Sequence, residues 1–266
     1  MLARSAEALF AHLIDYAGLF PPAALPMADA VRNYDACRRG EHAWMLGRFV
    51  LSAAQIGEAM AVASSAAFPL AMTELSVLAG AEAFPAGADM IETKATSADE
   101  IARIDARGRT VYVEVTDLEL IDALATRGLR AKIRTGGVIP DAFPTAAQVA
   151  AFIGRCAERG VAFKATAGLH HPLRCLKPLT YAADAPRSMM HGFVNVFLAA
   201  ALPAHAESIL LEDDPRAFEF DDDAASWRGH AVHTEDLARL RREFAISFGS
   251  CSFQEPIADL KELGWV

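Results

Sequence analysis

The sequence lacks several features that would assign it to a familiar class of protein. It carries 34 acidic residues against 25 lysines and arginines, which gives a formal charge of −9. A protein that binds nucleic acid or an acidic membrane surface needs the opposite balance. We therefore expect neither a nucleic-acid partner nor a membrane partner, and only a local basic pocket to attract an anion.

Cysteine and long apolar runs are scarce as well. The four cysteines, at positions 37, 156, 175 and 251, include no closely spaced pair, which argues against a zinc knuckle or a disulfide framework. Glu7, His12 and Asp15 interrupt the N-terminal apolar residues, so these do not resemble a signal peptide. The longest apolar run, around 193–203, is too short to span a bilayer. These absences predict a cytoplasmic protein with reduced thiols.

Regular alternation between strand-like and helix-like segments is abundant. Hydrophobic residues make up 53% of the chain, enough to bury a large core, and 266 residues suffice for one large domain or two ordinary ones. Several helices are predicted to begin at capping boxes, such as Ser97 with Glu100 and Thr145 with Gln148. Eight segments have the pattern of strands: 47–52, 69–75, 88–94, 110–115, 130–137, 161–168, 192–198 and 245–251.

Eight strands at this spacing predict an α/β fold, a single (β/α)8 or TIM barrel over 47–266. An open doubly wound sheet is the rival, but the glycine-rich turn that it needs is replaced by Ser52–Gln55. Residues 1–46 are predicted to be an N-terminal helical extension, two helices joined by a proline-rich stretch. It would close the barrel floor or reach over its mouth, with Asp15 and Tyr16 in a lid or at a helix end.

Two segments do not fit the repeat. Residues 169–190 lack helical periodicity, and a loop of this length in a compact domain is usually functional or mobile. Residues 218–228 alternate around an acidic turn and predict a small hairpin before the last helix.

Charged side chains are predicted to point into the barrel. Strand side chains alternate between faces, so turning the apolar set toward the helices leaves the polar set at the axis. The predicted interior holds five basic and three acidic residues: Arg48, Lys94, Lys132, Arg134 and Lys164 with Glu74, Glu92 and Glu114. Tyr112, Thr166 and Asn195 face the same way. An excess of positive charge inside an acidic protein suits a small anionic, oxygenated metabolite.

The alternative interpretation is a set of internal ion pairs, for example Glu92 with Lys132 and Glu114 with Lys94. Burying many charges for stability alone is a poor strategy compared with apolar packing. The sequence therefore favours a functional pocket.

Lys164 is the candidate nucleophile. A lysine loses its proton more readily when it is buried beside other cations, and Lys132 and Arg134 are predicted to lie on the neighbouring strand. A carboxylate, Glu92 or Glu114, or else Tyr112, would carry the protons of carbinolamine formation. Simple anion binding by a protonated lysine is the alternative.

The stretch from Lys164 to Gly168 (KATAG) resembles the strand-six segment K-x-(S/T)-x-G of the deoxyribose-phosphate aldolase family and related class I aldolases. The resemblance implies a barrel enzyme in which Lys164 forms a Schiff base with substrate. It departs one strand later, where those aldolases have a second lysine and this chain has Asn195. The stretches IDYAGLFPPA, FKATAGLHHP and FGSCSFQEP are similar to an uncharacterised bacterial family of barrel proteins, which implies no activity.

Histidines and glycines supply the remaining candidates. His170 and His171 follow the 161–168 strand at the end where barrel active sites lie, so one of them suits acid/base chemistry. A divalent metal held by these histidines with Glu92, Glu114 and either His191 or Cys251 is an alternative, although no metal-binding spacing supports it. The backbone at Gly249 and Ser250 is a candidate anion cradle.

The sequence thus predicts a cofactor-independent lyase, aldolase-like, or an isomerase. The catalytic candidates are Lys164, Glu92, Glu114 and His170. The substrate-binding candidates are Arg48, Lys94, Lys132, Arg134, Thr166, Asn195, Gly249 and Ser250. The alternatives are a metal-dependent lyase or hydrolase and a non-catalytic anion-binding barrel. Each of these functions is compatible with a homo-oligomer.

Overall fold

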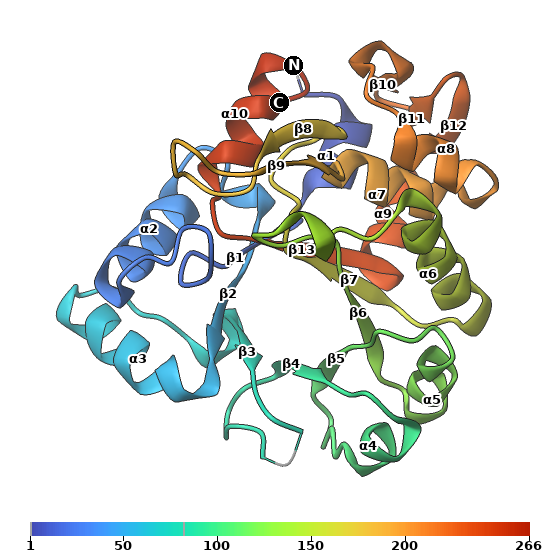
Figure 1. Cartoon of the computed structure of the whole chain (residues 1–266). Coiled ribbons are helices and arrows are strands. Elements are labelled where there is room, and N and C mark those ends of the chain that lie inside the picture. Colours follow the sequence, from blue (N-terminus) through green and yellow to red (C-terminus); the bar gives the residue numbers. More distant parts are fainter. Residues whose placement is uncertain (1, 82) are drawn as a thin grey trace.

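The computed structural model of the chain describes residues 2–81 and 83–266. Eight parallel strands close into a barrel, in the spatial order β1, β13, β7, β6, β5, β4, β3 and β2 (Figure 1). Their bounds are β1 Ile14–Tyr16, β2 Leu46–Ser52, β3 Leu75–Leu78, β4 Met90–Lys94, β5 Thr110–Glu114, β6 Arg130–Arg134, β7 Phe163–Thr166 and β13 Ala245–Ser250. The predicted (β/α)8 barrel is confirmed.

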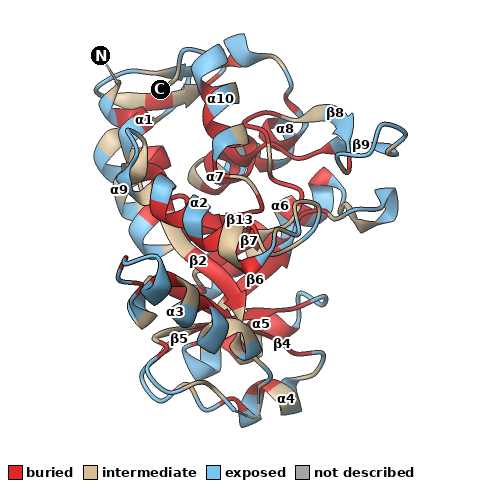
Figure 2. Cartoon of the chain, turned by 90° about the vertical axis from the view of Figure 1, so that its left-hand side faces the viewer, coloured by how far each residue is buried: buried red, intermediate tan, exposed pale blue. Residues whose placement is uncertain are grey.

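Helices form the outer layer, and their apolar faces cover the strands (Figures 1 and 2). They are α1 Arg4–Phe10, α2 Met27–Arg39, α3 Ile56–Ser65, α4 Ala98–Arg103, α5 Leu120–Arg127, α6 Ala146–Arg159, α7 Phe193–Ala201, α8 Ala206–Leu211, α9 Thr234–Glu243 and α10 Gln254–Glu262. The two chain ends lie close together beside α1 and α10. Within the described residues, no helix combines the length and apolar character needed to cross a membrane.

The first barrel strand lies inside the segment that was predicted to be an extension. Strand β1 pairs with β13 on one side and with β2 on the other. The two predicted helices are present as α1 and α2, but excluding 1–46 from the barrel is wrong for residues 14–16. Three residues are too few to show an alternating pattern, so the strand has no periodic signal. Asp15 and Tyr16 belong to this strand, not to a lid or a helix end.

The segment 192–198 is not a strand but most of helix α7, so its predicted place in the barrel is wrong. This helix is buried on all sides, so its sequence is a short apolar run. Periodicity cannot show whether such a run forms a buried strand or a buried helix. Asn195 therefore lies outside the barrel interior. Its amide donates to the carbonyls of Ile209 and Glu212, at 2.6 and 2.8 Å, and thereby joins α7 to α8.

The predicted 69–75 strand is displaced along the chain. The observed strand β3 begins at Leu75, and Glu74 lies in the preceding 3-10 turn. Glu74 pairs with Arg38 of α2 at 2.9 Å and does not enter the barrel, contrary to expectation.

Two small sheets lie outside the barrel. The loop predicted over 169–190 contains the antiparallel pair β8 (Cys175–Pro178) and β9 (Arg187–Met190). The predicted hairpin is present and continues into a third strand: β10 (Phe218–Phe220), β11 (Ala224–Trp227) and β12 (His230–His233).

Strand β7 is anchored to the helical layer by Phe163. The ring is fully buried and contacts the rings of Phe152, Phe197 and Phe244 at centroid distances of 5.6, 6.5 and 5.2 Å. Because adjacent strand residues face opposite ways, fixing Phe163 outward turns Lys164 toward the axis. Packing of Phe163 on the outside of the barrel therefore directs the side chain of Lys164 to the inside.

Phe163→Ala should lower the free energy of unfolding by about 3–5 kcal/mol, because the cavity left among three aromatic rings cannot collapse fully. Chemical denaturation monitored by circular dichroism measures the loss. Leu211→Ala, at a half-exposed position of α8, is the control and should change stability by no more than about 0.5 kcal/mol. Equal effects of the two substitutions would contradict the packing role of Phe163.

Candidate active site

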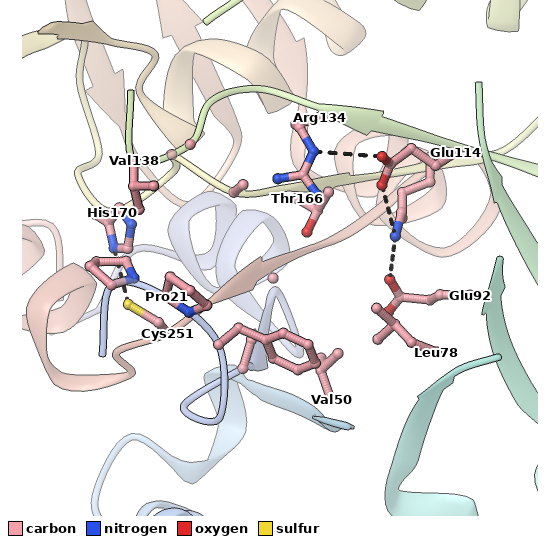
Figure 3. Close-up of a pocket in the computed structure, with 18 of the residues that line it drawn as sticks. Pro21, Val50, Leu78, Glu92, Glu114, Arg134, Val138, Thr166, His170 and Cys251 are labelled. Carbon is pink, nitrogen blue, oxygen red and sulfur yellow. Dashed lines mark hydrogen bonds and ion pairs between the residues drawn. The ribbon is translucent and has the colours of Figure 1, made fainter. Parts of the chain in front are cut away.

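A cavity of about 380 Å³ opens at the C-terminal ends of the barrel strands (Figure 3). Charged and polar lining residues are Glu92, Lys94, Glu114, Lys132, Arg134, Thr166 and His170. The proline-rich stretch after β1 reaches over the mouth and contributes Phe20, Pro21 and Pro22. This is one of the two positions predicted for it. Backbone near Gly137, Gly168 and Gly249 and the side chains of Val50, Leu78 and Cys251 complete much of the wall.

Strand register places four charged residues in one row. Lys94 is paired with Glu114, Glu114 with Lys132, and Lys132 with Lys164, across the adjacent strands β4, β5, β6 and β7. Side chains at paired positions of neighbouring strands are within contact distance. The row therefore reads cation, anion, cation, cation.

Lys164 lies at the centre of the barrel, with a side chain that is 1% exposed. Its Nζ donates to Asp15 Oδ2 and to Glu92 Oε1, both at 2.6 Å. These bonds cross the interior from β7 to β1 and β4. Lys164 is not among the described residues that line the cavity, but it contacts Glu92, which does line it.

The protonation of Lys164 differs from the sequence prediction. Burial by itself lowers the pKa of this lysine, but the adjacent Asp15 and Glu92 carboxylates outweigh burial and raise its pKa above the ordinary value. The expectation that Lys132 and Arg134 would destabilise the ammonium is therefore wrong for this state of the protein. The carboxylate of Asp15 contributes to the raised pKa of Lys164, and the sequence did not predict that Asp15 lies beside this lysine.

Asp15 is a site residue that sequence reasoning missed. It is buried and accepts hydrogen bonds from Ser247 Oγ and from the backbone amide of Arg48, both at 2.7 Å. These donors and Lys164 compensate the buried charge. The one feature of the sequence that could have indicated this role is a charged residue between Ile14 and Tyr16, because a charge in an apolar stretch needs a partner.

Lys132 is the buried lysine that reaches the cavity. Its side chain is 3% exposed, and Nζ lies 3.1 Å from Glu92 Oε2 and 3.1 Å from Glu114 Oε2. Burial acts to raise the pKa of Glu92, but Lys164 and Lys132 hold it well below the usual range. Glu92 also accepts a hydrogen bond from Ser76 Oγ at 2.7 Å. It is therefore a permanent carboxylate shared by two lysines.

Glu114 is the less restrained carboxylate. Burial favours its neutral form, but Lys132 and then Lys94 and Arg134 lower its pKa. Lys94 approaches at 3.0 Å and Arg134 at 3.5 Å, and these two cations are 65% and 47% exposed at the mouth. Among described residues, Glu114 Oε2 has no well-aligned hydrogen bond, although it pairs with Lys132. This oxygen has capacity to accept a further hydrogen bond.

The charged cluster combines Lys94, Lys132, Arg134 and Lys164 with Asp15, Glu92 and Glu114, an excess of one positive charge. The ion pairs weighed as the structural alternative, Glu92 with Lys132 and Glu114 with Lys94, are both present. Internal pairing thus coexists with two partly exposed cations, Lys94 and Arg134, at the mouth of the cavity.

His170 and Cys251 lie on the opposite side of the cavity (Figure 3). The Sγ of Cys251 is 4.0 Å from Nδ1 of His170, and Glu255 Oε2 is 3.4 Å from the same nitrogen. Burial lowers the pKa of His170, but Cys251 and Glu255 more than compensate and raise it to about 9. The ring is therefore an imidazolium at neutral pH.

Other predicted site residues fall into two groups. Thr166 and Gly249 line the cavity as expected. Arg48 instead pairs with Asp89, at the N-terminal ends of the strands, so its expected place in the pocket is wrong. Ser250 Oγ donates to the carbonyl of Ser252 and is directed into its own turn.

The histidines and glutamates of the metal alternative are not brought together. His171 contacts Asp259 of α10 at 2.6 Å, and His191 Nε2 lies 2.7 Å from the carbonyl of Pro144. Among residues 2–81 and 83–266, no group of three or more histidine, cysteine, aspartate or glutamate side chains is arranged to hold a metal ion.

No protein-family model matches the chain, and neither does any curated protein. The function is therefore inferred from the geometry of the site.

Glu92→Gln should lower the free energy of unfolding at neutral pH by about 3–5 kcal/mol, because Lys132 and Lys164 lose a shared counter-ion in the interior. The depressed pKa of Glu92 means that its contribution is complete above the unfolded-state pKa of about 4.3 and is lost as the pH falls. Urea unfolding between pH 6 and pH 3 should therefore show wild type and variant converging at low pH.

The matched control is Glu219→Gln, at an exposed position of β10, which should follow the wild-type pH profile. A destabilisation of Glu92→Gln that is the same at every pH would indicate a packing defect and contradict the charge-based explanation.

Proposed function

We propose that this protein is an enzyme that acts on a small anionic oxo compound through a lysine imine, as an aldolase-like lyase or an isomerase, and that Lys132 provides the amine. The supporting observation is the position of Lys132. It is buried, it lines the cavity, and it lies between two carboxylates, whereas Lys164 donates short hydrogen bonds to Asp15 and Glu92 and is not among the lining residues.

Counting β1 as the first barrel strand changes the comparison with class I aldolases. Lys132 then lies on the sixth barrel strand and Lys164 on the seventh, in direct register. The aldolases that the sequence resembles carry lysines on these two strands, so the departure attributed to Asn195 no longer applies. The KATAG segment itself moves to the seventh strand. The lysine pair, and not the short segment, now supports the resemblance.

Imine formation uses groups already in place. Lys132 transfers a proton to Glu114, and the free amine adds to the substrate carbonyl to give a carbinolamine. Glu114 returns the proton to the carbinolamine oxygen, which leaves as water, and an iminium ion remains on Lys132. Lys164 stays protonated in the next strand, where its ammonium is paired with Asp15 and Glu92.

The rim of the cavity suits the anionic end of the substrate. Lys94 and Arg134 present partly exposed cations beside Glu114, and an arginine fork fits the oxygens of a carboxylate or a phosphate. The excess positive charge of the cluster is matched by one substrate anion. The imidazolium of His170 faces them across the cavity as a proton donor.

Borohydride reduction in the presence of pyruvate or glyceraldehyde 3-phosphate should add the reduced substrate to Lys132, because hydride converts an iminium ion into a stable secondary amine. Peptide mass spectrometry locates the added mass. Lys132→Met should abolish both trapping and turnover of the trapped compound.

Lys177→Met, at an exposed position of β8, is the matched lysine control and should be trapped like wild type. Trapping on Lys164 alone would contradict the assignment of Lys132. Conversion of either compound with no modified lysine would contradict imine chemistry, and binding without conversion would instead favour a non-catalytic barrel.

Arg134→Gln should weaken the binding of lactate or glycerol 3-phosphate by about tenfold, or about 1.4 kcal/mol. These probes keep the anion but lack the carbonyl, so calorimetric titration reports the anion contact alone. Arg32→Gln, on the exposed surface of α2, is the control and should bind like wild type. Unchanged affinity in Arg134→Gln would exclude this side chain from the anion site.

A further inference from the structure

A thiol and a histidine meet at the cavity wall opposite the charged cluster, and the proposed imine chemistry does not use the thiol. Cys251 follows β13, and His170 follows β7, so the closed barrel brings two distant segments together. Tyr181, from the β8–β9 connection, places its hydroxyl 3.9 Å from the same sulfur. Two potential hydrogen-bond donors thus converge on Cys251 Sγ.

The arrangement is that of an ion pair and not of a nucleophile–base–acid relay. A relay requires the thiol and the carboxylate to contact opposite nitrogens of the imidazole. Here Cys251 and Glu255 both approach Nδ1, at 4.0 and 3.4 Å. The sulfur and the carboxylate therefore share one edge of the ring, and Nε2 contacts neither of them.

The other three thiols have different surroundings. Burial raises the pKa of Cys37 and of Cys175 to about 11, and it raises that of Cys156 further. Cys37 contacts the amide of Gln254 at 3.6 Å. Cys251, by contrast, borders the 380 Å³ cavity directly, so a small solute in the cavity reaches its sulfur.

We propose that Cys251, in contact with His170 at the cavity wall, reacts as its thiolate with hydrogen peroxide that enters the cavity, and is converted to a sulfenic acid. The sulfur attacks one peroxide oxygen, so that an S–O bond forms as the O–O bond breaks. The departing hydroxide takes a proton from His170 and leaves as water. The cysteine is oxidised by two electrons and the peroxide is reduced by two. The hydroxyl of Tyr181 stabilises the departing oxygen.

Hydrogen peroxide with dimedone, which traps sulfenic acids, tests this proposal by residue-resolved mass spectrometry of the intact protein. Cys251 should be labelled at least about tenfold faster than Cys175, because burial raises the pKa of Cys175 to about 11 and leaves very little of it as thiolate at neutral pH. This comparison needs only the wild-type chain, with Cys175 as a more exposed internal reference. Labelling of Cys251 no faster than that of Cys175 overturns the proposal.

His170→Gln should slow the labelling of Cys251 about tenfold, because it removes the cation that stabilises the thiolate. His171→Gln is the matched control: it removes the adjacent histidine, which contacts Asp259, and should leave the Cys251 rate unchanged. Cys175 should react equally in all three proteins, which verifies that each is folded. Equal effects of the two histidine substitutions on Cys251 overturn the ion-pair explanation. No substrate is involved, so failure of the imine proposal leaves this test intact.

Discussion

The interior of this barrel depends on one ammonium group. Lys164 bonds to Asp15 and Glu92 at 2.6 Å each, and so links the seventh barrel strand to the first and the fourth across the axis. Its long apolar stem and central charge occupy space that branched apolar side chains fill in most barrels of this kind. Removing one partner would leave a charge unpaired in a medium of low polarity, which is much more costly than exchanging the whole set for apolar residues. The charges therefore persist as a group.

The same bonds divide the two neighbouring lysines into different roles. Glu92 is shared: one oxygen accepts from Lys164, and the other pairs with Lys132. Lys164, bound by Asp15 as well, is locked in its protonated form. Lys132 has longer contacts, at 3.1 Å, and faces the cavity. The two lysines therefore differ in their partners and in their access to the cavity, although they occupy paired positions on neighbouring strands.

Alternation along strands predicted most of the interior where strands were long enough to show it, although Arg48 of β2 pairs with Asp89 and does not line the pocket. The register argument placed Lys132, Lys164, Glu92 and Glu114 at the axis, and all four are there. The same argument failed for two segments that show no alternation. Strand β1 has three residues and no measurable period, and α7 is apolar on every face, so its period is hidden. One strand, β1, was not predicted, and one predicted strand is the helix α7, so the predicted number of barrel strands was still eight.

The strand that the sequence did not predict, β1, also carries the carboxylate that sets the protonation of Lys164. With Asp15 assigned to an extension, Lys164 had cations as its expected neighbours, and its ammonium was expected to be unstable. Strand pairing of β1 with β13 brings Asp15 to the axis, and one carboxylate reverses the sign of that argument. Composition and local pattern contain no information about contacts between residues 149 positions apart. Such contacts decide whether a buried lysine keeps its proton.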